Sequence, residues 1–327
     1  MSQMNEDPSP SNVSCEGNVP AESKCNNSIE QKHVTDFLKV KEIGEGTYGT
    51  VYLVKEKATG NEYAMKACLK VQILKEKMVD YVHREKNILA KLSTKELNHF
   101  SIIKLYATFQ DADSLYFLLQ YAKYGDLYHV MMKKEMKKFN LEETLYYSAC
   151  LLSALKHLHS LRILHRDVKP ENMLVLGDGR VALSDFGSAK DLTAPQRTTE
   201  NSRRRRRSFV GTPEFVSPEM LEGAGEVTEA ADIWSFAVTL YQFLTGKHAF
   251  HAPSEYLVMK RVTGALFTYP DDFDYSAKTL IEKILIVEVD KRLKLEEIEA
   301  DPFFQTINWT TLPTTQPPTI ELSPSLQ

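Results

Sequence analysis

The sequence predicts an α+β fold with two lobes, a small lobe built on an antiparallel sheet and a larger, mostly helical lobe. Apolar residues alternate with polar ones from residue 37 to about residue 119, the pattern of half-buried strands. From about residue 123 to residue 304 they recur at spacings of three and four, which indicates helices. The chain has 327 residues, of which 43% are hydrophobic, so it can bury a large core.

Both ends of the chain differ in composition from this globular part. Residues 1–36 contain no Phe, Tyr or Trp and are rich in Ser, Asn, Glu and Pro, so they bury too little apolar surface to offset chain entropy. We expect a disordered leader there. Residues 305–327 are rich in Pro and Thr and predict an extended tail.

The small lobe is expected to be a meander of strands interrupted by one main helix. Residues 37–44 and 50–69 read as strands, with a turn at 58–61. Residues 82–92 have apolar positions at helical spacing, and two further strand-like runs follow at 102–110 and 114–122.

The large lobe is expected to be helical around one central helix. Residues 141–161 form an amphipathic helical pattern, whereas residues 231–246 are apolar nearly all round. A helix that is apolar on every face belongs inside a core, so we place 231–246 at the centre. Residues 181–187 read as a short strand-like insert.

Charge and cysteine content exclude several functional classes. The 40 Lys and Arg against 44 Asp and Glu give a formal charge of −4, which argues against a binder of nucleic acid that relies on overall positive charge. The four cysteines form no C-x-x-C pair, so neither a zinc site nor a disulfide scaffold is indicated. With no apolar run of about 18 residues and no secretory pattern at the N-terminus, we expect a cytoplasmic protein without integral membrane contact.

The run GEGTYGTV at 44–51 is a candidate phosphate-binding loop. Its G-x-G-x-x-G spacing also occurs in dinucleotide-binding turns and in ordinary glycine hairpins. In a dinucleotide fold the third glycine opens a helix, whereas Gly49 precedes a β-branched run that favours a strand. A glycine loop between two strands resembles the lid over ATP phosphates in protein kinases.

Two charged residues in apolar surroundings are candidates for the same site. Lys66 lies inside an apolar strand, where an ammonium is costly unless an anion meets it. Taken alone, such a lysine would more often extend to solvent from a strand end. Glu85, on the apolar side of the following helix, is the partner expected to hold Lys66 in place.

The segments HRDVKPEN at 165–172 and DFG at 185–187 decide between these readings. Two carboxylates and an amide at this spacing match the catalytic and metal-binding loops of protein kinases. Phosphoryl transfer requires charge neutralisation and in-line positioning. Asp185 and Asn172 would hold Mg²⁺, Asp167 would orient the substrate hydroxyl, and Lys169 would stabilise the transferring phosphoryl group.

On these motifs the chain resembles eukaryotic protein kinases over about residues 37–309, which implies the two-lobe protein kinase fold. The segments KPEN and GTPEFVSPE resemble those of Ser/Thr kinases, in which Thr212 bridges Asp167 and Lys169. Asp232 resembles the residue that ties down the catalytic-loop backbone, and Arg292 resembles the ion-pair partner of Glu219.

The resemblance implies a set of residues around ATP and Mg²⁺. The catalytic candidates are Asp167, Lys169, Lys66, Glu85 and Thr212. The nucleotide-binding candidates are Ile43, Gly44, Gly46, Thr47, Tyr48, Gly49, Val51, Ala64, Lys66, Leu119, Gln120, Tyr121, Ala122, Asp126, Glu171, Leu174 and Asp185, and the metal candidates are Asn172 and Asp185.

Four segments narrow the resemblance to the AGC group, and within it to the phosphoinositide-dependent protein kinases. They are residues 105–127, 184–190, 208–221 and 301–312. In this group a short helix, here within 69–77, borders a groove that binds the C-terminal hydrophobic motif of client kinases. The implied groove residues are Lys70, Ile73, Leu74, Val82, Gln110 and Leu115; the alternative is that these are ordinary core residues of the small lobe.

The chain also departs from that group. The kinases it resembles carry a C-terminal lipid-binding domain, and the sequence offers too few residues after 309 to encode one, so phosphoinositide binding is not expected. Lys86 stands where an arginine is expected near the phosphate site of the groove, which loses bidentate recognition. Five arginines at 203–207 precede Ser208, which aligns with an autophosphorylated serine, and Arg166 is the expected partner of its phosphate.

We therefore expect a Ser/Thr kinase whose substrates are AGC-type kinases. A first alternative is an AGC kinase for generic basic substrates, attracted by Glu171 and Asp126. A second is a docking scaffold without turnover, against which the complete set of catalytic residues argues.

Overall fold

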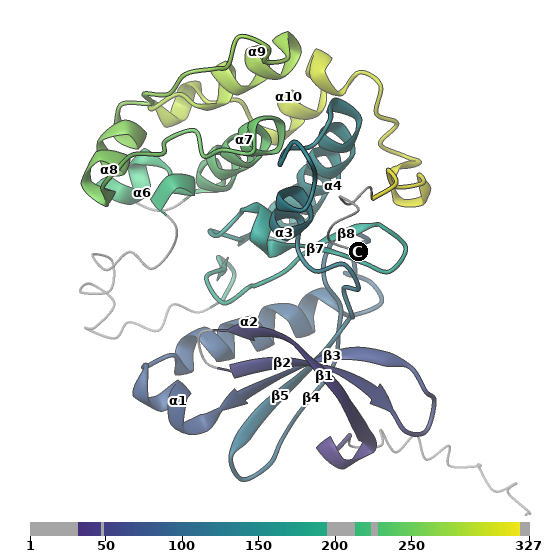
Figure 1. Ribbon diagram of the computed structural model, residues 1–327. Helices are drawn as coiled ribbons and strands as arrows, with labels where there is room; N and C mark the ends of the chain where they lie inside the picture. Colours follow the sequence, from purple (N-terminus) through teal and green to yellow (C-terminus); the bar gives the residue numbers. More distant parts are fainter. Residues whose placement is uncertain (1–31, 47–48, 195–212, 224–227, 321–327) are drawn as a thin grey trace, which may run out of the picture. The chain divides into compact units, whose positions relative to one another are not determined.

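The computed structural model describes residues 32–46, 49–194, 213–223 and 228–320. The small lobe is built on an antiparallel sheet, as predicted; the sheet has five strands in the order β1-β2-β3-β5-β4 (Figure 1). Its strands are β1 (Phe37–Gly46), β2 (Gly49–Glu56), β3 (Glu62–Leu69), β4 (Leu105–Gln110) and β5 (Ser114–Leu119). Helices α1 (Lys70–Lys75) and α2 (Val79–Leu92) follow β3.

The alternation along each strand separates two apolar layers. On one face Met65 pairs with Leu118 beneath an aromatic cluster, in which Phe37 stacks on Phe109 with ring centroids 5.9 Å apart. On the other face the sheet packs against α2 through Phe117. Helix α2 buries Val82, Glu85, Ile88, Leu89 and Leu92. It begins three residues before the predicted helix, at Val79.

The large lobe is helical and centred on α7 (Glu229–Thr245), as its apolar sequence predicted. Trp234, Phe236 and Ala237 of α7 have no exposed surface, and α4 (Leu141–Ser160) packs against it (Figure 1). The other α-helices are α3 (Leu127–Met132), α6 (Pro218–Glu222), α8 (Glu255–Thr263), α9 (Tyr275–Ile284) and α10 (Leu295–Glu299). The 3-10 turns are η1 (Val34–Asp36), η2 (Pro170–Asn172), η3 (Pro213–Phe215), η4 (Val289–Lys291), η5 (Pro302–Phe304) and η6 (Leu312–Thr314).

Two small two-stranded sheets frame the loops that carry the motifs. Strand β7 (Met173–Val175) pairs with β8 (Val181–Leu183), so the segment after Asn172 runs antiparallel to the segment before Asp185. Strand β6 (Ile163–Leu164) pairs with β9 (Lys190–Asp191) on the other side of the same loops. These pairings bring residues 165–172 and 185–187 together.

The described parts of both terminal segments contact the lobes. Lys32 forms an ion pair with Glu56, and residues 34–36 form η1. The rest of the predicted leader, 1–31, lies outside the described residues. After residue 304 the chain packs on the large lobe, where Leu312 is 2% exposed and Trp309 and Ile320 are partly buried. The Pro and Thr content of this segment did not indicate that packing.

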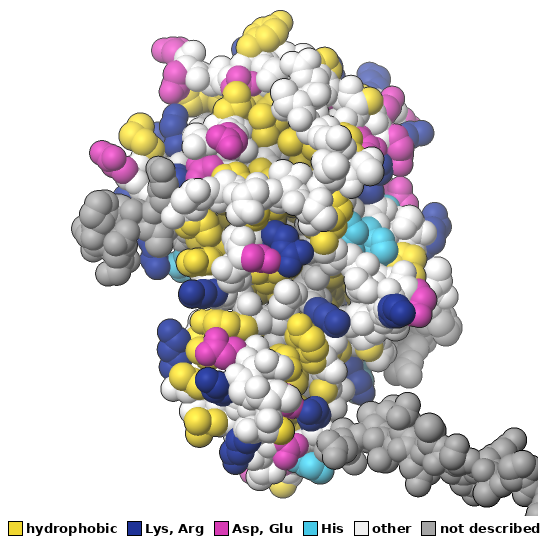
Figure 2. All heavy atoms as spheres, turned by 90° about the vertical axis from the view of Figure 1, so that its right-hand side faces the viewer, with side chains coloured by type: hydrophobic (Ala, Val, Ile, Leu, Met, Phe, Trp, Pro, Cys, Tyr) yellow, Lys and Arg dark blue, Asp and Glu magenta, His cyan; other side chains and the backbone are white. Residues whose placement is uncertain are grey.

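On the face drawn in Figure 2, acidic and basic side chains are interspersed with apolar ones. Within the described ranges, none of the helices combines the length and the apolar character needed to cross a bilayer.

Candidate active site

The glycines of the 44–51 run lie where β1 and β2 pair as an antiparallel hairpin. Gly44 pairs with Val51, and Gly46 pairs with Gly49. A Cβ at Gly49 would lie 2.0 Å from the carbonyl oxygen of Ala67, so only glycine fits at this point of β2 beside β3. The strand–turn–strand arrangement excludes a dinucleotide-binding turn, which would open a helix. Thr47 and Tyr48 lie outside the described residues.

Lys66 and Glu85 form a closed ion pair between β3 and α2. The Nζ of Lys66 lies 2.7 Å from Oε1 and 2.9 Å from Oε2 of Glu85. The side chain of Lys66 is 14% exposed and that of Glu85 is 3% exposed. Burial alone would lower the pKa of Lys66, but the carboxylates of Glu85 and Asp185 outweigh it and raise the pKa. Lys66 is therefore a fixed cation.

One buried carboxylate fixes the backbone of the catalytic loop. Asp232, at the start of α7, accepts hydrogen bonds from the backbone N–H of His165 at 2.9 Å and of Arg166 at 2.7 Å. It also lies 2.8 Å from Nε2 of His159. These bonds fix Arg166 in a left-handed conformation, φ +65°, which is strained for a residue other than glycine.

Within this loop the predicted catalytic side chains contact one another. Lys169 donates from Nζ to both carboxylate oxygens of Asp167 at 3.0 Å. Asn172 donates from Nδ2 to the Asp167 carbonyl oxygen at 2.7 Å and to its Oδ2 at 3.0 Å. Because the amide nitrogen is used inside the loop, the oxygen Oδ1 of Asn172 is the atom suited to a cation.

The DFG segment places a second carboxylate at this loop. Asp185 adopts φ +60°, and its Oδ1 accepts hydrogen bonds from the hydroxyl of Tyr81 at 3.0 Å and from the N–H of Gly187 at 3.3 Å. Phe186 is fully buried with its ring against that of His165. Ser184 donates to the carbonyl oxygen of Asn172 from both its N–H and its hydroxyl, which links the two candidate metal-binding segments.

The residues present fit a Mg²⁺ ion shared with a nucleotide. One carboxylate and one amide oxygen are hard donors of the type that Mg²⁺ uses together with substrate phosphates. Across the described residues, no cluster of three or more acidic, His or Cys side chains forms a protein-only metal cage. Asp185 and Asn172 are thus suited to a metal that arrives with phosphate oxygens.

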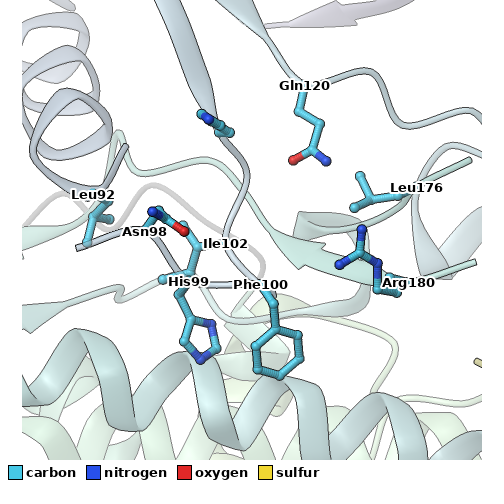
Figure 3. A pocket seen from close by; sticks show the side chains of 9 residues that line it. Leu92, Asn98, His99, Phe100, Ile102, Gln120, Leu176 and Arg180 are labelled. Atoms are coloured by element: carbon cyan, nitrogen blue, oxygen red, sulfur yellow. The ribbon is translucent and has the colours of Figure 1, made fainter. Parts of the chain in front are cut away.

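The residues expected around the adenine come from both lobes. Ala64 on β3 pairs with Leu119 on β5, and Leu174 lies on β7. Gln120 differs from the rest, because its side chain lines a separate cavity of about 140 Å³ with Lys104, Arg180 and six other residues (Figure 3). Any contact of Gln120 with a nucleotide therefore falls to its backbone.

A profile of the protein kinase domain matches residues 37–304. The chain belongs to the protein kinase family. It is 39% identical over 294 residues to mouse 3-phosphoinositide-dependent protein kinase 1, which covers 88% of this chain and 50% of that protein. It is 40% identical over 281 residues to the serine/threonine-protein kinase PKH2 of Candida albicans, which covers 85% of this chain and 29% of that protein. The chain thus spans about a third to a half of the length of these relatives.

In this kinase domain a second arginine accompanies Arg166, and the sequence interpretation missed it. Arg84 of α2 donates from Nη1 to the carbonyl oxygen of Gly187 at 2.7 Å, and Arg166 donates from Nε to that of Ser188 at 2.6 Å. Burial lowers the pKa of Arg166, and the nearby charge of Arg84 lowers it further. Its position one residue before Glu85 was the only sequence signal. Ser208, Thr212 and the arginines at 203–207 lie outside the described residues.

The expected pair between Glu219 and Arg292 is present in the large lobe. The guanidinium donates from Nη1 to Oε1 at 2.9 Å and from Nη2 to Oε2 at 3.1 Å, a bidentate geometry. Arg292 also donates to the carbonyl oxygen of Ala230 and lies over the ring of Trp234. The pair therefore anchors α6 to the central helix.

The two carboxylates expected to attract basic substrates have different surroundings. Asp126 caps α3, and its side chain accepts from the N–H of His129 at 2.8 Å. Glu171 is partly buried, and burial raises its pKa, with lesser contributions from neighbouring groups. Both carboxylates are thus less free to meet a basic substrate than the sequence suggested.

The predicted docking residues lie around α1, α2 and the adjoining edge of the sheet. Ile73 and Val82 are each 4% exposed and belong to the core, and Leu115 is partly buried. Leu74 is 67% exposed. Lys70 donates from Nζ to the carbonyl oxygen of Asp111, and Gln110 pairs with Leu115 at the end of β4. The apolar surface offered to a ligand at this place comes mainly from α1 and the residue before it, since Val71 on the helix and Leu69 at the end of β3 are also exposed.

Proposed function

We propose that the protein is a Ser/Thr kinase that transfers the γ-phosphate of ATP to Ser or Thr in the activation loops of other AGC-type kinases. The observation that carries the proposal is the closed ion pair between Lys66 and Glu85, buried beside the carboxylate of Asp185. A lysine fixed as a cation at the mouth of a glycine hairpin is suited to phosphate oxygens.

The chain's own groups supply what the reaction requires. Lys66 binds and orients phosphate oxygens, because Glu85 prevents it from turning to solvent. Asp167 orients the substrate hydroxyl and takes up its proton. Lys169, 3.0 Å from Asp167, neutralises charge on the transferring group and keeps the carboxylate in place.

Asp185 and Asn172 are proposed to hold Mg²⁺. When bound, the ion neutralises phosphate charge and orients the phosphates for in-line transfer. The hydrogen bonds from Ser184 to the Asn172 carbonyl oxygen hold the Asn172 segment next to the Asp185 segment, so neither segment has to become ordered when Mg²⁺ binds.

The substrate class is supported by similarity and by the docking surface. The curated relatives include proteins named 3-phosphoinositide-dependent protein kinase in mouse and Dictyostelium discoideum. Around α1, exposed Leu74 beside partly buried Leu115 could receive the aromatic side chains of a client's hydrophobic motif. Lys86 would attract an acidic group there only through screened charge.

Activation by phosphorylation of Ser208 is part of the proposal. Arg84 and Arg166 donate to the neighbouring carbonyl oxygens of Gly187 and Ser188, and the charge of Arg84 lowers the pKa of Arg166. A phosphate of about −1.5 to −2 charge would be attracted by both guanidinium groups. We also propose a cytoplasmic location, supported by two buried free thiols, Cys68 and Cys150.

The test is incubation of the protein with Mg²⁺, labelled ATP and a panel of catalytically inactive AGC kinases, followed by mapping of the phosphosites. We expect label in activation loops with the wild type and none with Lys66→Met. No transfer to any substrate would support the scaffold alternative, and equal transfer to short basic peptides would support the generic basophilic kinase.

Docking is tested separately with Leu74→Glu and a Phe-x-x-Phe peptide. We expect loss of peptide binding and of client phosphorylation, with normal phosphorylation of a short activation-loop peptide. Leu266→Glu is the matched control, since Leu266 is 58% exposed on the large lobe. Unchanged binding by Leu74→Glu would remove the docking step from the proposal.

A further inference from the structure

Three neighbouring residues on one side of α2 contact three parts of the active site. Glu85 binds Lys66, and Arg84 donates to the carbonyl oxygen of Gly187. Tyr81, one turn earlier, donates its hydroxyl hydrogen to Oδ1 of Asp185 at 3.0 Å. Residues at spacings of three and four share a helix face, so a single helix position determines all three contacts. The first contact belongs to the proposed phosphate site, but nothing above gives the tyrosine a function.

The ring of Tyr81 is held tightly against the DFG backbone. A Cβ at Gly187 would lie 1.7 Å from Cε1 and 2.0 Å from Cζ of the ring, closer than any real contact. Glycine at 187 is therefore what allows the ring to approach this segment so closely. Because the ring is confined, its hydroxyl reaches Asp185 from a fixed direction, and little entropy is lost when the hydrogen bond forms.

The acceptor also needs support from outside its own loop. Asp185 has φ +60°, a conformation that persists only where the surroundings impose it. Its Oδ1 takes both hydrogen bonds described above, from Tyr81 and from the N–H of Gly187. This assignment leaves Oδ2 for a cation.

We propose that Tyr81 is a positioning residue for Asp185, which orients the carboxylate so that Oδ2 meets Mg²⁺ on the nucleotide phosphates. The inference rests on the proposed function, because it concerns the same metal site. A neutral donor suits this place, since a lysine or arginine would compete with the metal for the carboxylate charge. A phenol hydroxyl is protonated at neutral pH, so it serves as a donor to the carboxylate.

The effect expected from removing the hydroxyl is that of losing an outer partner of a metal ligand, about 10- to 100-fold in metal affinity. Tyr81→Phe keeps the ring against Gly187 and removes the hydroxyl, with its hydrogen bonds to Asp185 and Ser188. Tyr116→Phe is the matched control, because Tyr116 on β5 also donates its hydroxyl to a carboxylate, Asp111 Oδ2 at 2.7 Å.

The experiment is calorimetry of ADP binding to the full chain, with Mg²⁺ and with a chelator, which separates the metal contribution from that of the nucleotide. For Tyr81→Phe we expect the ADP affinity in chelator to equal that of the wild type. The factor by which Mg²⁺ increases the ADP affinity should be at least about 10-fold smaller than in the wild type. Tyr116→Phe should match the wild type in both conditions.

Two results would overturn the inference. An undiminished Mg²⁺-dependent gain in Tyr81→Phe would show that the hydroxyl does not orient the metal ligand. An equal loss of ADP affinity with and without Mg²⁺ would show a general structural role instead. A wild-type protein that binds no ADP in either condition would refute the proposed function itself, which is a distinguishable outcome.

Discussion

Replacing Glu85 with Gln should damage stability and phosphoryl transfer together. The substitution keeps the shape of the side chain and removes its charge, which leaves the ammonium of Lys66 without its closest counter-charge. The two side chains are 14% and 3% exposed, so solvent screens little of the loss. Breaking a buried pair by removing one partner costs about 3–5 kcal/mol in unfolding free energy.

That cost can be measured by thermal unfolding. For a domain of this size, about 3 kcal/mol corresponds to a fall in Tm of about 6–12 °C. Turnover with ATP, assayed well below the new Tm, should fall on the order of 100-fold, because Lys66 no longer has a fixed position against the phosphates.

The control for this prediction is a similarly buried pair remote from the site. Lys134 and Glu143 lie 2.7 Å apart with side chains 15% and 4% exposed. Glu143→Gln should also lower Tm by several degrees, and should leave turnover unchanged. If Glu85→Gln lost stability but retained turnover like this control, the ion pair would be structural and the reasoning about Lys66 would be refuted.

Four further outcomes are expected. Asp167→Asn should lower kcat far more than nucleotide affinity, because its carboxylate meets the substrate hydroxyl; single-turnover kinetics and ADP calorimetry measure the two, and equal losses would count against that assignment. Ser208 should carry phosphate when the protein is expressed active and none in an inactive variant expressed without other kinases; intact mass decides this, and full activity of Ser208→Ala would contradict its ordering role. Burial lowers the pKa of His99 to about 4, so the folded state resists protonation and the unfolding free energy should fall by about 2 kcal/mol from pH 7 to pH 5. Denaturant titrations at the two pH values should show a smaller fall in His99→Gln. An identical fall in that variant would assign the pH dependence to other groups. Leu115→Glu should weaken peptide docking as Leu74→Glu does, and its Tm shows whether the variant still folds, since Leu115 is partly buried. Full peptide binding by a folded Leu115→Glu variant would mean that Leu115 only packs in the core.

The fold was predictable because its strongest patterns are local. Strands β1 to β3 follow the alternation of apolar residues, and the all-round apolar run at 231–246 could only be a central helix. What the sequence did not reveal depends on residues that pack after the chain turns. The segment at 305–320 reads as polar and proline-rich, yet Leu312 and Trp309 lie against the large lobe, since single apolar residues spaced along an irregular segment have no period to detect.

The candidate site shows the same division. Asp167, Asn172 and Asp185 stand in short motifs whose spacing is informative, so they could be named from the sequence. Arg84 and Tyr81 stand in no motif, because their partners are 103 and 104 residues away and one of those partners is a backbone carbonyl. A contact with a carbonyl oxygen places no constraint on residue type and leaves no sequence signal.

Helix α2 is the element through which these contacts depend on one another. One face carries Tyr81 and Glu85, which contact Asp185, the proposed metal ligand, and Lys66, the proposed phosphate-binding residue. Val82 of the same helix lies in the core next to α1. A side chain packed into the core resists small displacements, because close-packed interiors lose contacts when they shift. We therefore expect a ligand that changes the packing around α1 to displace α2 as a unit, and such a displacement would alter the Lys66 pair and the Asp185 hydrogen bond together. Docking near Leu74 and metal binding at Asp185 should accordingly be coupled, and by linkage a docking peptide and Mg²⁺–ADP should each change the affinity for the other by the same factor.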